Sequence, residues 1–245
     1  MTTQYLIPES QLSLSMPTGR GLRKIVEVPN KDIHPALVIA GRESLPGATD
    51  YQNVAANLLR GDWWTPRRIF VTSPATGDGK TCTAFNLAWA FSQLEKSVLL
   101  LELNFVRPQF RTVLGDLRIW HGIDGALRGS AKPADSIFSM GTTGLDVGAV
   151  RDATPVAQLK QFVHRLDAFL DWCSQEYDWL ILDCPPVLSP EWHQWFRDYA
   201  GPTLLVIREQ HTSMVETRKA AKRLGDNLKG VLLNDSAAAG DSRAI

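Results

Sequence analysis

The segment from Ile69 to Thr83 constrains the fold of this chain more than any other part of the sequence. It reads I-F-V-T-S-P-A-T-G-D-G-K-T-C-T, which is a short apolar run, a glycine-containing turn and then the start of a helical pattern. Gly77 and Gly79 allow the backbone to turn sharply with its N–H groups facing inward. The following helix adds the positive end of its dipole at the same point. The segment therefore predicts an anion-binding loop between a buried strand and a helix.

The residues at the end of this loop indicate which anion it binds. Lys80 can reach the β- and γ-phosphates of a nucleotide, and the Thr81 hydroxyl can hold Mg²⁺. The strict pattern G-x-x-x-x-G-K-[ST] has glycine at the position of Pro74, so the match is partial. A tight strand–helix turn without a ligand is the alternative reading of the loop alone.

A second element favours the nucleotide. Residues 177–186 read Y-D-W-L-I-L-D-C-P-P, an apolar strand that ends in the carboxylate of Asp183. A nucleotide-binding sheet places the acid that holds Mg²⁺, directly or through water, at this point. We therefore expect Lys80 and Asp183 to be catalytic, and Thr81 and Asp183 to hold Mg²⁺. The residues expected to contact the nucleotide are Thr76, Gly77, Asp78, Gly79, Lys80, Thr81 and Cys82.

From residue 68 onward, apolar runs alternate with helical patterns. Strands are expected at 68–73, 97–103, 145–150, 178–183, 203–207 and 230–234, and the clearest helices at 80–95, 154–175 and 213–225. Most of the runs are almost continuously apolar, as strands buried on both faces are. The pattern predicts an α/β fold with a mostly parallel sheet covered by helices on both faces. Ligands of such sheets bind beyond the carboxyl ends of the strands, where both the loop and Asp183 fall.

Three regions are expected along the chain. Residues 1–48 are rich in Pro, Ser and Gly and predict an extended arm or tail, and residues 237–245 predict a flexible tail. The nucleotide-binding domain is expected to span 49–236. It would open with a short helix capped by Asp50, whose inward stripe is Tyr51, Val54, Ala55 and Leu58.

Composition excludes several classes of protein. The 245 residues carry 26 basic and 26 acidic side chains, so net charge does not point to nucleic acid. No apolar run reaches the roughly 18–20 residues of a membrane span, and the N-terminus lacks the pattern of a signal peptide, so we expect a cytoplasmic location. The three cysteines, Cys82, Cys173 and Cys184, fit no zinc or disulfide spacing and are interpreted as reduced packing residues. No metal is assigned to the five histidines.

Four segments together resemble the bacterial tyrosine autokinases of capsule and exopolysaccharide synthesis, a branch of the P-loop ATPases. The loop T-S-P-A-T-G-D-G-K-T is similar to the family's T-S-x-x-P-G-E-G-K-S/T, and Y-D-W-L-I-L-D-C-P-P-V-L to its Y-D-x-V-I-I-D-T-P-P-V. Residues 99–108, L-L-L-E-L-N-F-V-R-P, resemble its second acidic motif L-L-I-D-x-D-x-R-R-P, and residues 230–234 resemble G-V-V-L-N. The resemblance covers residues 50 to 235. Ala75 stands where the partition ATPases carry a signature Lys.

The resemblance implies a P-loop NTPase fold that binds ATP or ADP with Mg²⁺. It implies that Glu102 is catalytic and that Asn234 lies near the nucleotide base. It further implies a homo-oligomer at the inner membrane, attached through a membrane chain-length or co-polymerase protein, with no nucleic acid partner.

The departures from the family bear on activity. The two Asp residues of the second acidic motif are Glu102 and Asn104, and its first Arg is Val106. Asn keeps an acceptor but cannot act as a base. The subunit-contact arginines of the family are replaced by Gln52 and Ala55. The sequence ends without the family's Tyr cluster, so we expect no autophosphorylation on a C-terminal tyrosine tail.

Three functions therefore stay open: a slow ATPase or protein-tyrosine kinase, a nucleotide-gated regulatory module of polysaccharide export that phosphorylates nothing, and a purely structural subunit. The last is disfavoured because Lys80, Thr81 and Asp183 are all present. Two aromatic groups are noted. Trp192, Trp195, Phe196 and Tyr199 lie at helical spacing and predict core packing or a partner surface, and Trp63 and Trp64 predict either exposure or partner contact. A basic helix segment, Arg218, Lys219, Lys222 and Arg223, predicts a solvated face.

Overall fold

The structure is a computed structural model of the chain. It describes residues 14–15, 23–26, 34–38, 47–61, 67–115, 121–141, 145–160, 164–195 and 201–235. Four aromatic residues noted in the sequence lie outside these ranges: Trp63, Trp64, Phe196 and Tyr199. Of Trp195 only the backbone is described.

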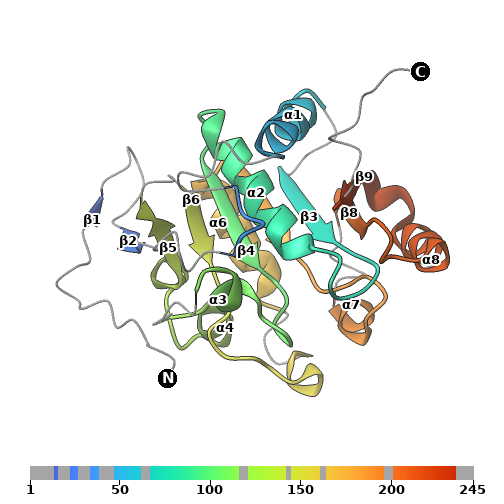
Figure 1. The fold of residues 1–245 in the computed structure, drawn as a ribbon. Helices are drawn as coiled ribbons and strands as arrows, with labels where there is room; N and C mark the ends of the chain where they lie inside the picture. The colour runs from blue at the N-terminus through green and yellow to red at the C-terminus, as the bar shows by residue number, and fades with distance from the viewer. Residues whose placement is uncertain are drawn as a thin grey trace, which may run out of the picture.

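The described strands form one nine-stranded sheet in the order β1-β2-β5-β6-β4-β7-β3-β8-β9 (Figure 1). Neighbours are parallel except β1 with β2 and β5 with β6. The strands are β1 (Leu14–Ser15), β2 (Arg23–Val26), β3 (Arg68–Thr72), β4 (Val98–Glu102), β5 (Ile137–Met140), β6 (Leu145–Gly148), β7 (Trp179–Asp183), β8 (Thr203–Arg208) and β9 (Leu228–Asn234). This confirms the predicted mostly parallel sheet.

Helices cover both faces of the sheet. Figure 1 shows α1 and α2 in front of the strands and α6 behind them. The described helices are α1 (Ala48–Leu59), α2 (Lys80–Gln93), α3 (Phe110–Val113), α4 (Ile123–Arg128), α6 (Leu166–Glu176), α7 (Pro190–Trp195) and α8 (Met214–Leu224), with short 3-10 turns at Pro133–Ser136, Val156–Gln158 and Gly225–Asn227. One apolar cluster joins α1, α2 and α3 to the front face, and another joins α4, α6, α7 and α8 to the back face.

All six predicted strands are present, and the differences lie at helix starts and at the sheet edge. The first helix begins at Ala48 after Gly47, whose φ is +93°, so Asp50 lies in its first turn and is not its cap. The helix expected over 154–175 is divided: a 3-10 turn spans Val156–Gln158, Lys160 is helical, and α6 begins at Leu166 after a turn at residues 164–165. Strand β5 was missed because I-F-S-M is short and its antiparallel place beside β6 depends on tertiary pairing.

The central strands of the sheet are buried from solvent. Every residue of β4 and of β7 is buried, which matches their nearly continuous apolar sequences. The polar exceptions in these two strands are Glu102 and Asp183, the last residue of each, and both are 0% exposed. Because the strands are parallel and in register, Glu102 lies beside Asp183. Two carboxyl groups are thus buried side by side at the carboxyl end of the sheet.

Part of the region predicted as an arm packs on α2. Leu37 and Val38 are buried in the front cluster. The buried amide of Asn86 accepts from Val38 N at 2.9 Å and donates to Ala36 O at 3.0 Å, so it binds the backbone as a neighbouring strand would. Strand β2 of the same region pairs with β5. The domain boundaries at residues 48 and 236 stay predictions.

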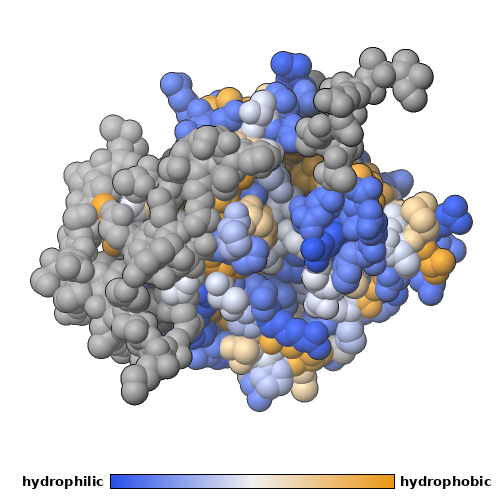
Figure 2. Space-filling view, viewed as in Figure 1, coloured by the Kyte–Doolittle hydropathy of each residue, from blue (hydrophilic) through white to orange (hydrophobic). Residues whose placement is uncertain are grey.

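The surface seen in Figure 2 is mostly hydrophilic where described residues form it, with apolar residues scattered among them. Among the described residues, the exposed large apolar side chains are Met214, Val215, Val231 and Leu233. They belong to α8 and to the edge strand β9. Trp192, from the aromatic stripe, is 2% exposed and packs in the back cluster, which favours core packing for that residue. None of the helices that the structure describes is both long and apolar enough to cross a membrane.

The Asn86 contact leads to a stability prediction. Asn86→Ala should lower the free energy of unfolding by about 1–3 kcal/mol, because it leaves the buried Val38 N–H and the Ala36 carbonyl without partners. Gln93→Ala, an exposed change in the same helix, is the matched control and should have little effect. Urea denaturation of both variants measures the difference. Equal stability of the two variants would mean that the 34–38 segment is not held by Asn86.

Candidate functional site

The loop between β3 and α2 adopts the conformation that its glycines predict. Gly77 and Gly79 have φ of +95° and +87°, in the left-handed region that favours glycine. Gly79 also lacks room for a side chain, because an added Cβ would lie 2.0 Å from Asn234 Nδ2. The loop ends directly at Lys80, the first residue of α2, so the helix N-terminus faces the turn. The loop therefore has the backbone conformation that its glycines predicted, and its role in binding an anion stays a prediction.

Lys80, Thr81 and Asp183 form one buried, hydrogen-bonded group. Lys80 Nζ lies 3.1 Å from Asp183 Oδ1, and Thr81 Oγ1 donates to Asp183 Oδ2 at 2.8 Å. Lys80 Nζ also donates to Thr81 Oγ1 at 3.1 Å. Burial raises the pKa of the Asp183 carboxyl, while the Lys80 ammonium and the Thr81 hydroxyl act in the opposite direction. Residues more than a hundred positions apart thus meet as the sequence predicted.

These residues fit a magnesium ion that is bound together with phosphates. Among the residues that the structure describes, no group of three or more His, Cys, Asp or Glu side chains could hold a metal by itself. Mg²⁺ is usually held by one or two carboxylates, with water and substrate phosphates as the remaining ligands. Thr81 Oγ1 and the Asp183 carboxylate supply hard oxygen ligands of this kind at one point. The nucleotide would bring the rest.

Two segments that are distant in sequence, at Thr212 and at Asn234, form hydrogen bonds with Asp78 of the loop. The buried carboxylate of Asp78 accepts from Ala75 N at 3.1 Å and from Thr212 Oγ1 at 2.8 Å. Asn234 Nδ2 donates to Asp78 O at 3.1 Å. The Asp78 side chain therefore supports the loop from inside, and Asn234 at the end of β9 contacts the loop backbone. Sequence reasoning missed Thr212, since nothing in its local pattern shows that it reaches residue 78.

Glu102 occupies a different environment from the one that its family position implied. Its Oε1 accepts from Gln109 N and from Phe110 N (2.9 Å), and its Oε2 accepts from Val150 N at 2.9 Å. Burial raises the Glu102 pKa to about 7, and the three backbone N–H groups act against this. Both oxygens are thus occupied by the segments that follow β4 and β6. In the structure the carboxylate supports these two segments, and the expectation that Glu102 is catalytic stays a prediction.

The cysteines are unmodified packing residues in the structure. All three are free thiols; Cys173 and Cys184 are buried and Cys82 is partly buried. Burial raises the pKa of Cys82 to about 11, and burial also raises that of Cys184 well above its usual value. Cys82 Sγ lies 3.7 Å from His34 Nδ1, at the outer side of α2. The raised thiol pKa values of Cys82 and Cys184 agree with the expectation that these two residues are not nucleophiles.

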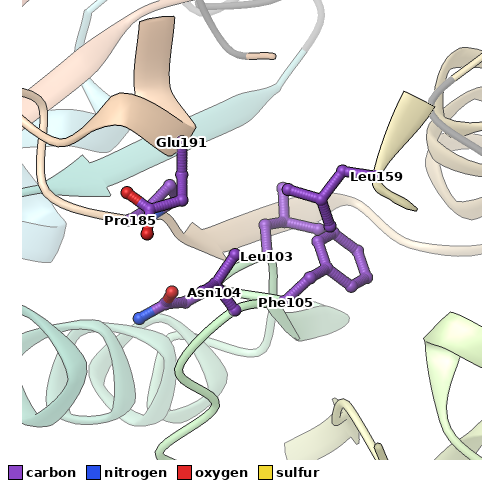
Figure 3. Close-up of a pocket in the computed structure, with 7 residues that line it drawn as sticks. Leu103, Asn104, Phe105, Leu159, Pro185 and Glu191 are labelled. Carbon is purple, nitrogen blue, oxygen red and sulfur yellow. The ribbon is translucent and has the colours of Figure 1, made fainter. Parts of the chain in front are cut away.

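A small pocket opens beside the buried group (Figure 3). It is lined by Leu103, Asn104, Phe105, Val106, Leu159, Pro185 and Glu191. Its walls follow β4 and β7 directly, and Leu103 N donates to Asp183 O at 2.8 Å, which ties one wall to the end of β7. Pro185 O accepts from Thr72 Oγ1 at 2.7 Å, which ties the other wall to the end of β3. The pocket therefore adjoins the end of the site where Lys80 and Asp183 lie.

Comparison of the sequence with known proteins finds tyrosine-protein kinases of bacteria among its relatives. No protein-family model matches the chain. Tyrosine-protein kinase etk of Escherichia coli K12 is 28% identical over 174 residues, which are 69% of this chain and 24% of etk. Tyrosine-protein kinase YwqD of Bacillus subtilis is 27% identical over 172 residues, covering 69% of this chain and 72% of YwqD. Over about two thirds of its length the chain is therefore similar in sequence to bacterial tyrosine-protein kinases. It spans about a quarter of the length of the enterobacterial relatives that it matches.

Solved structures agree on the fold. The kinase domain of Escherichia coli tyrosine kinase ETK superposes with a TM-score of 0.72 at 22% identity, covering 87% of this chain and 86% of that one. The septum site-determining protein MinD of Pyrococcus horikoshii, complexed with Mg-ADP, gives a TM-score of 0.55 at 21% identity and covers 68% of each chain. These likenesses confirm the P-loop NTPase fold that the resemblance implied.

The Glu102 environment leads to a prediction for stability against pH. The pKa is 4.5 in the unfolded chain and about 7 in the fold, so the native state holds a proton that the unfolded state has lost between these values. The contribution of this carboxyl group to the free energy of unfolding is therefore complete below pH 4.5. We expect about 3 kcal/mol of this free energy to be lost as the pH rises from 4.5 through 7. Glu102→Gln should remove this part of the pH dependence, although it also weakens one amide contact.

The measurement is urea unfolding of the wild type and of Glu102→Gln between pH 5 and pH 8. Glu95→Gln, an exposed glutamate at the opposite end of the sheet, is the matched control and should keep the wild-type slope. If Glu102→Gln and wild type lose stability in parallel over this range, the assignment of the slope to Glu102 is wrong.

Proposed function

We propose that this chain is an ATP-binding P-loop protein of exopolysaccharide or capsule biosynthesis, similar to the tyrosine-kinase component of such systems and weak or regulatory in its activity. The observation that carries the proposal is the buried group of Lys80, Thr81 and Asp183 at the end of a glycine loop. The capsule or exopolysaccharide setting is supported by the name of one relative, a putative tyrosine-protein kinase in the cps region of Klebsiella pneumoniae. The alignment covers only about a quarter of that protein and of etk.

Each residue of the group has a role in binding ATP or ADP with Mg²⁺. The N–H groups of residues 76–82 and the α2 N-terminus surround the phosphates, and Lys80 neutralises their outer charge. Thr81 and Asp183 would hold the Mg²⁺ ion, which would supply positive charge next to the phosphate oxygens. Asn234 contacts the loop backbone at Asp78 O, and the base is expected to lie near it. Asp78 and Cys82 contribute their backbone.

Binding must change the contacts that the structure shows. Lys80 Nζ now lies on Asp183, so a nucleotide has to draw Lys80 toward its phosphates while Asp183 keeps the metal. This exchange gives the protein two states that differ at one buried ion pair. This exchange of partners is compatible with a nucleotide-gated regulatory module and with an enzyme. Active phosphorylation of a partner on tyrosine is the alternative function, and gating without catalysis is the further one.

The setting is proposed from the resemblance. The chain would act in the cytoplasm, at the inner membrane through a membrane chain-length or co-polymerase protein, and as a homo-oligomer. The arm of residues 1–48, part of which packs on α2, would be distinct from the nucleotide-binding domain of 49–236 and the tail of 237–245. The replacement of subunit-contact arginines by Gln52 and Ala55 suggests contacts that differ from those of the family.

Lys80→Ala tests the proposal directly. It should abolish ADP binding, because it removes the charge that meets the phosphates, while the chain stays folded. Lys96→Ala, at an exposed lysine beyond the other end of α2, is the control and should bind like the wild type. Titration calorimetry with ADP and Mg²⁺ measures both, and circular dichroism checks the fold. Equal ADP affinity in the Lys80 and Lys96 variants would show that the loop is not the nucleotide site.

A further inference from the structure

Strand β9 is the last strand of the sheet, and among the described residues it has a neighbouring strand, β8, on one side only (Figure 1). An edge strand of this kind presents N–H and C=O groups that can pair with another strand, and proteins protect such edges with bulges, prolines and lysines. In β9 the protection lies at the beginning, where the register to β8 shifts between Leu228 and Gly230 and Lys229 stands at the irregularity. Residues 230–234, G-V-L-L-N, contain neither a charged side chain nor a proline. The regular part of the edge is therefore open to pairing.

The backbone of β9 directs the polar groups of two residues away from β8. Glu209 N donates to Asn234 O at 3.0 Å, so the backbone of Asn234 faces β8. Successive residues of a strand direct their N–H and C=O groups to opposite sides. Leu232 therefore faces β8 as well, whereas Val231 and Leu233 direct their groups outward. Another strand can bond to these two residues without displacing a hydrogen bond between β8 and β9.

The same two residues expose apolar side chains. Val231 is 51% exposed and Leu233 is 54% exposed. In the sheet they lie beside Leu205 and Ile207 of β8, which pack in the back cluster together with residues of α8. Helix α8 thus covers the back face over β8 and leaves β9 half exposed. A strand that pairs with β9 would cover these side chains and bond to the backbone of the same residues.

We propose that β9 is an interface between two copies of this chain, which pair antiparallel about a two-fold axis at Leu232. Reversing residues 230–234 about their middle residue places Val231 opposite Leu233 of the partner subunit. These two residues form the hydrogen-bonded pair, and the two copies of Leu232 form the non-hydrogen-bonded pair between them, as the backbone directions require. The inference rests on the proposed function only in that it gives the proposed homo-oligomer a contact surface.

The charges at the two ends of the strand favour this register. A two-fold axis through the paired strands keeps each side chain on its own face, so the alternative registers differ in steps of two residues. With Leu232 on the axis, Lys229 comes opposite Asp235 of the partner subunit, and opposite charges at such positions stabilise a strand pair. With the axis one residue earlier, Lys229 would come opposite Leu233 instead. Asp235 also accepts from Arg208 Nε at 2.6 Å, so its carboxylate would lie between two cations.

Sedimentation velocity of the full chain tests the interface. The contact is small, so we expect a weak dimer that forms at about 100 µM chain and dissociates at about 1 µM. Val231→Lys places a charge in the middle of the open edge and should weaken the dimer about tenfold or more, because the change occurs twice in each dimer. Val215→Lys is the matched control: it is the same substitution at a valine of α8 that is 61% exposed, and it should dimerise like the wild type.

Cysteine cross-linking tests the register. In Leu232→Cys the two introduced thiols lie on the axis, where opposite Cα atoms are about 4.5 Å apart, within the range that a disulfide spans. In Val231→Cys, the matched control, the two thiols lie diagonally, about 7–8 Å apart. After mild oxidation, a non-reducing gel should show covalent dimer mainly for Leu232→Cys. The wild type, with its own three free thiols, should show little.

Calorimetry with ADP and circular dichroism on the same proteins separate the possible outcomes. A wild type that stays monomeric at about 100 µM overturns the inference, and the edge then belongs to another partner or to solvent. A dimer that Val231→Lys leaves as strong as the wild type overturns the role of β9, and stronger cross-linking of Val231→Cys than of Leu232→Cys overturns the register. If Val231→Lys does not fold, the comparison of the two cysteine variants decides. A chain that dimerises through β9 but does not bind ADP supports the inference and contradicts the proposed function.

Discussion

The negative charge of Asp183, buried completely at the end of a central strand, is the constraint on which the site depends. An isolated carboxylate in such a position is strongly disfavoured, so it has to be neutralised, paired or bound to a metal. In the structure Lys80 and Thr81 provide the pairing, and both belong to the first turn of α2. The ion pair therefore links the phosphate loop to the sheet. Removing either Lys80 or Asp183 would leave the other charge buried without a partner. A ligand that binds Lys80 or Asp183 must therefore replace the partner that it displaces.

Glu102 shows a second solution to the same problem on the adjacent strand. It lies beside Asp183 in the sheet, yet no cation pairs with it among the described residues; backbone N–H groups from two loops surround it instead. Such an arrangement fixes the segments that follow β4 and β6, and it leaves the carboxylate unavailable to a ligand. Asp183, which is bound by side chains, is suited to exchange Lys80 for a metal ion. Glu102, which is bound by backbone N–H groups, is suited to hold the two loops in place. The longer side chain at position 102 reaches amides that lie beyond the strand end.

The sequence predicted the parts of the fold that depend on local pattern. The nearly continuous apolar runs of β4 and β7 and the turn at Gly77 and Gly79 were sufficient to place the sheet and the loop. That the loop with Lys80 and the carboxylate of Asp183 lie at the same edge followed from the rule that parallel strands end together, whereas their direct ion pair was not predicted. Contacts between distant segments could not be read in this way. Nothing in the neighbouring sequence predicts the hydrogen bond from Thr212 to Asp78. The same is true of the hydrogen bonds of Asn86 with residues 36 and 38. The hydrogen bonds of Glu102 to the N–H groups of Phe110 and Val150 also have no local signature, because they depend on segments that only the fold brings together.

The most direct test of this account is the dependence of ADP binding on Mg²⁺ in the wild type and in Asp183→Asn. Calorimetric titrations with Mg²⁺ and with a chelator give the two affinities for each protein. If Thr81 and Asp183 hold the metal and Lys80 meets the phosphates, Mg²⁺ should tighten ADP binding to the wild type. The amide that replaces the carboxylate carries no charge, so in the Asp183→Asn variant this gain should be largely lost while ADP still binds without the metal. An equal gain from Mg²⁺ in both proteins would contradict the central role of the buried carboxylate.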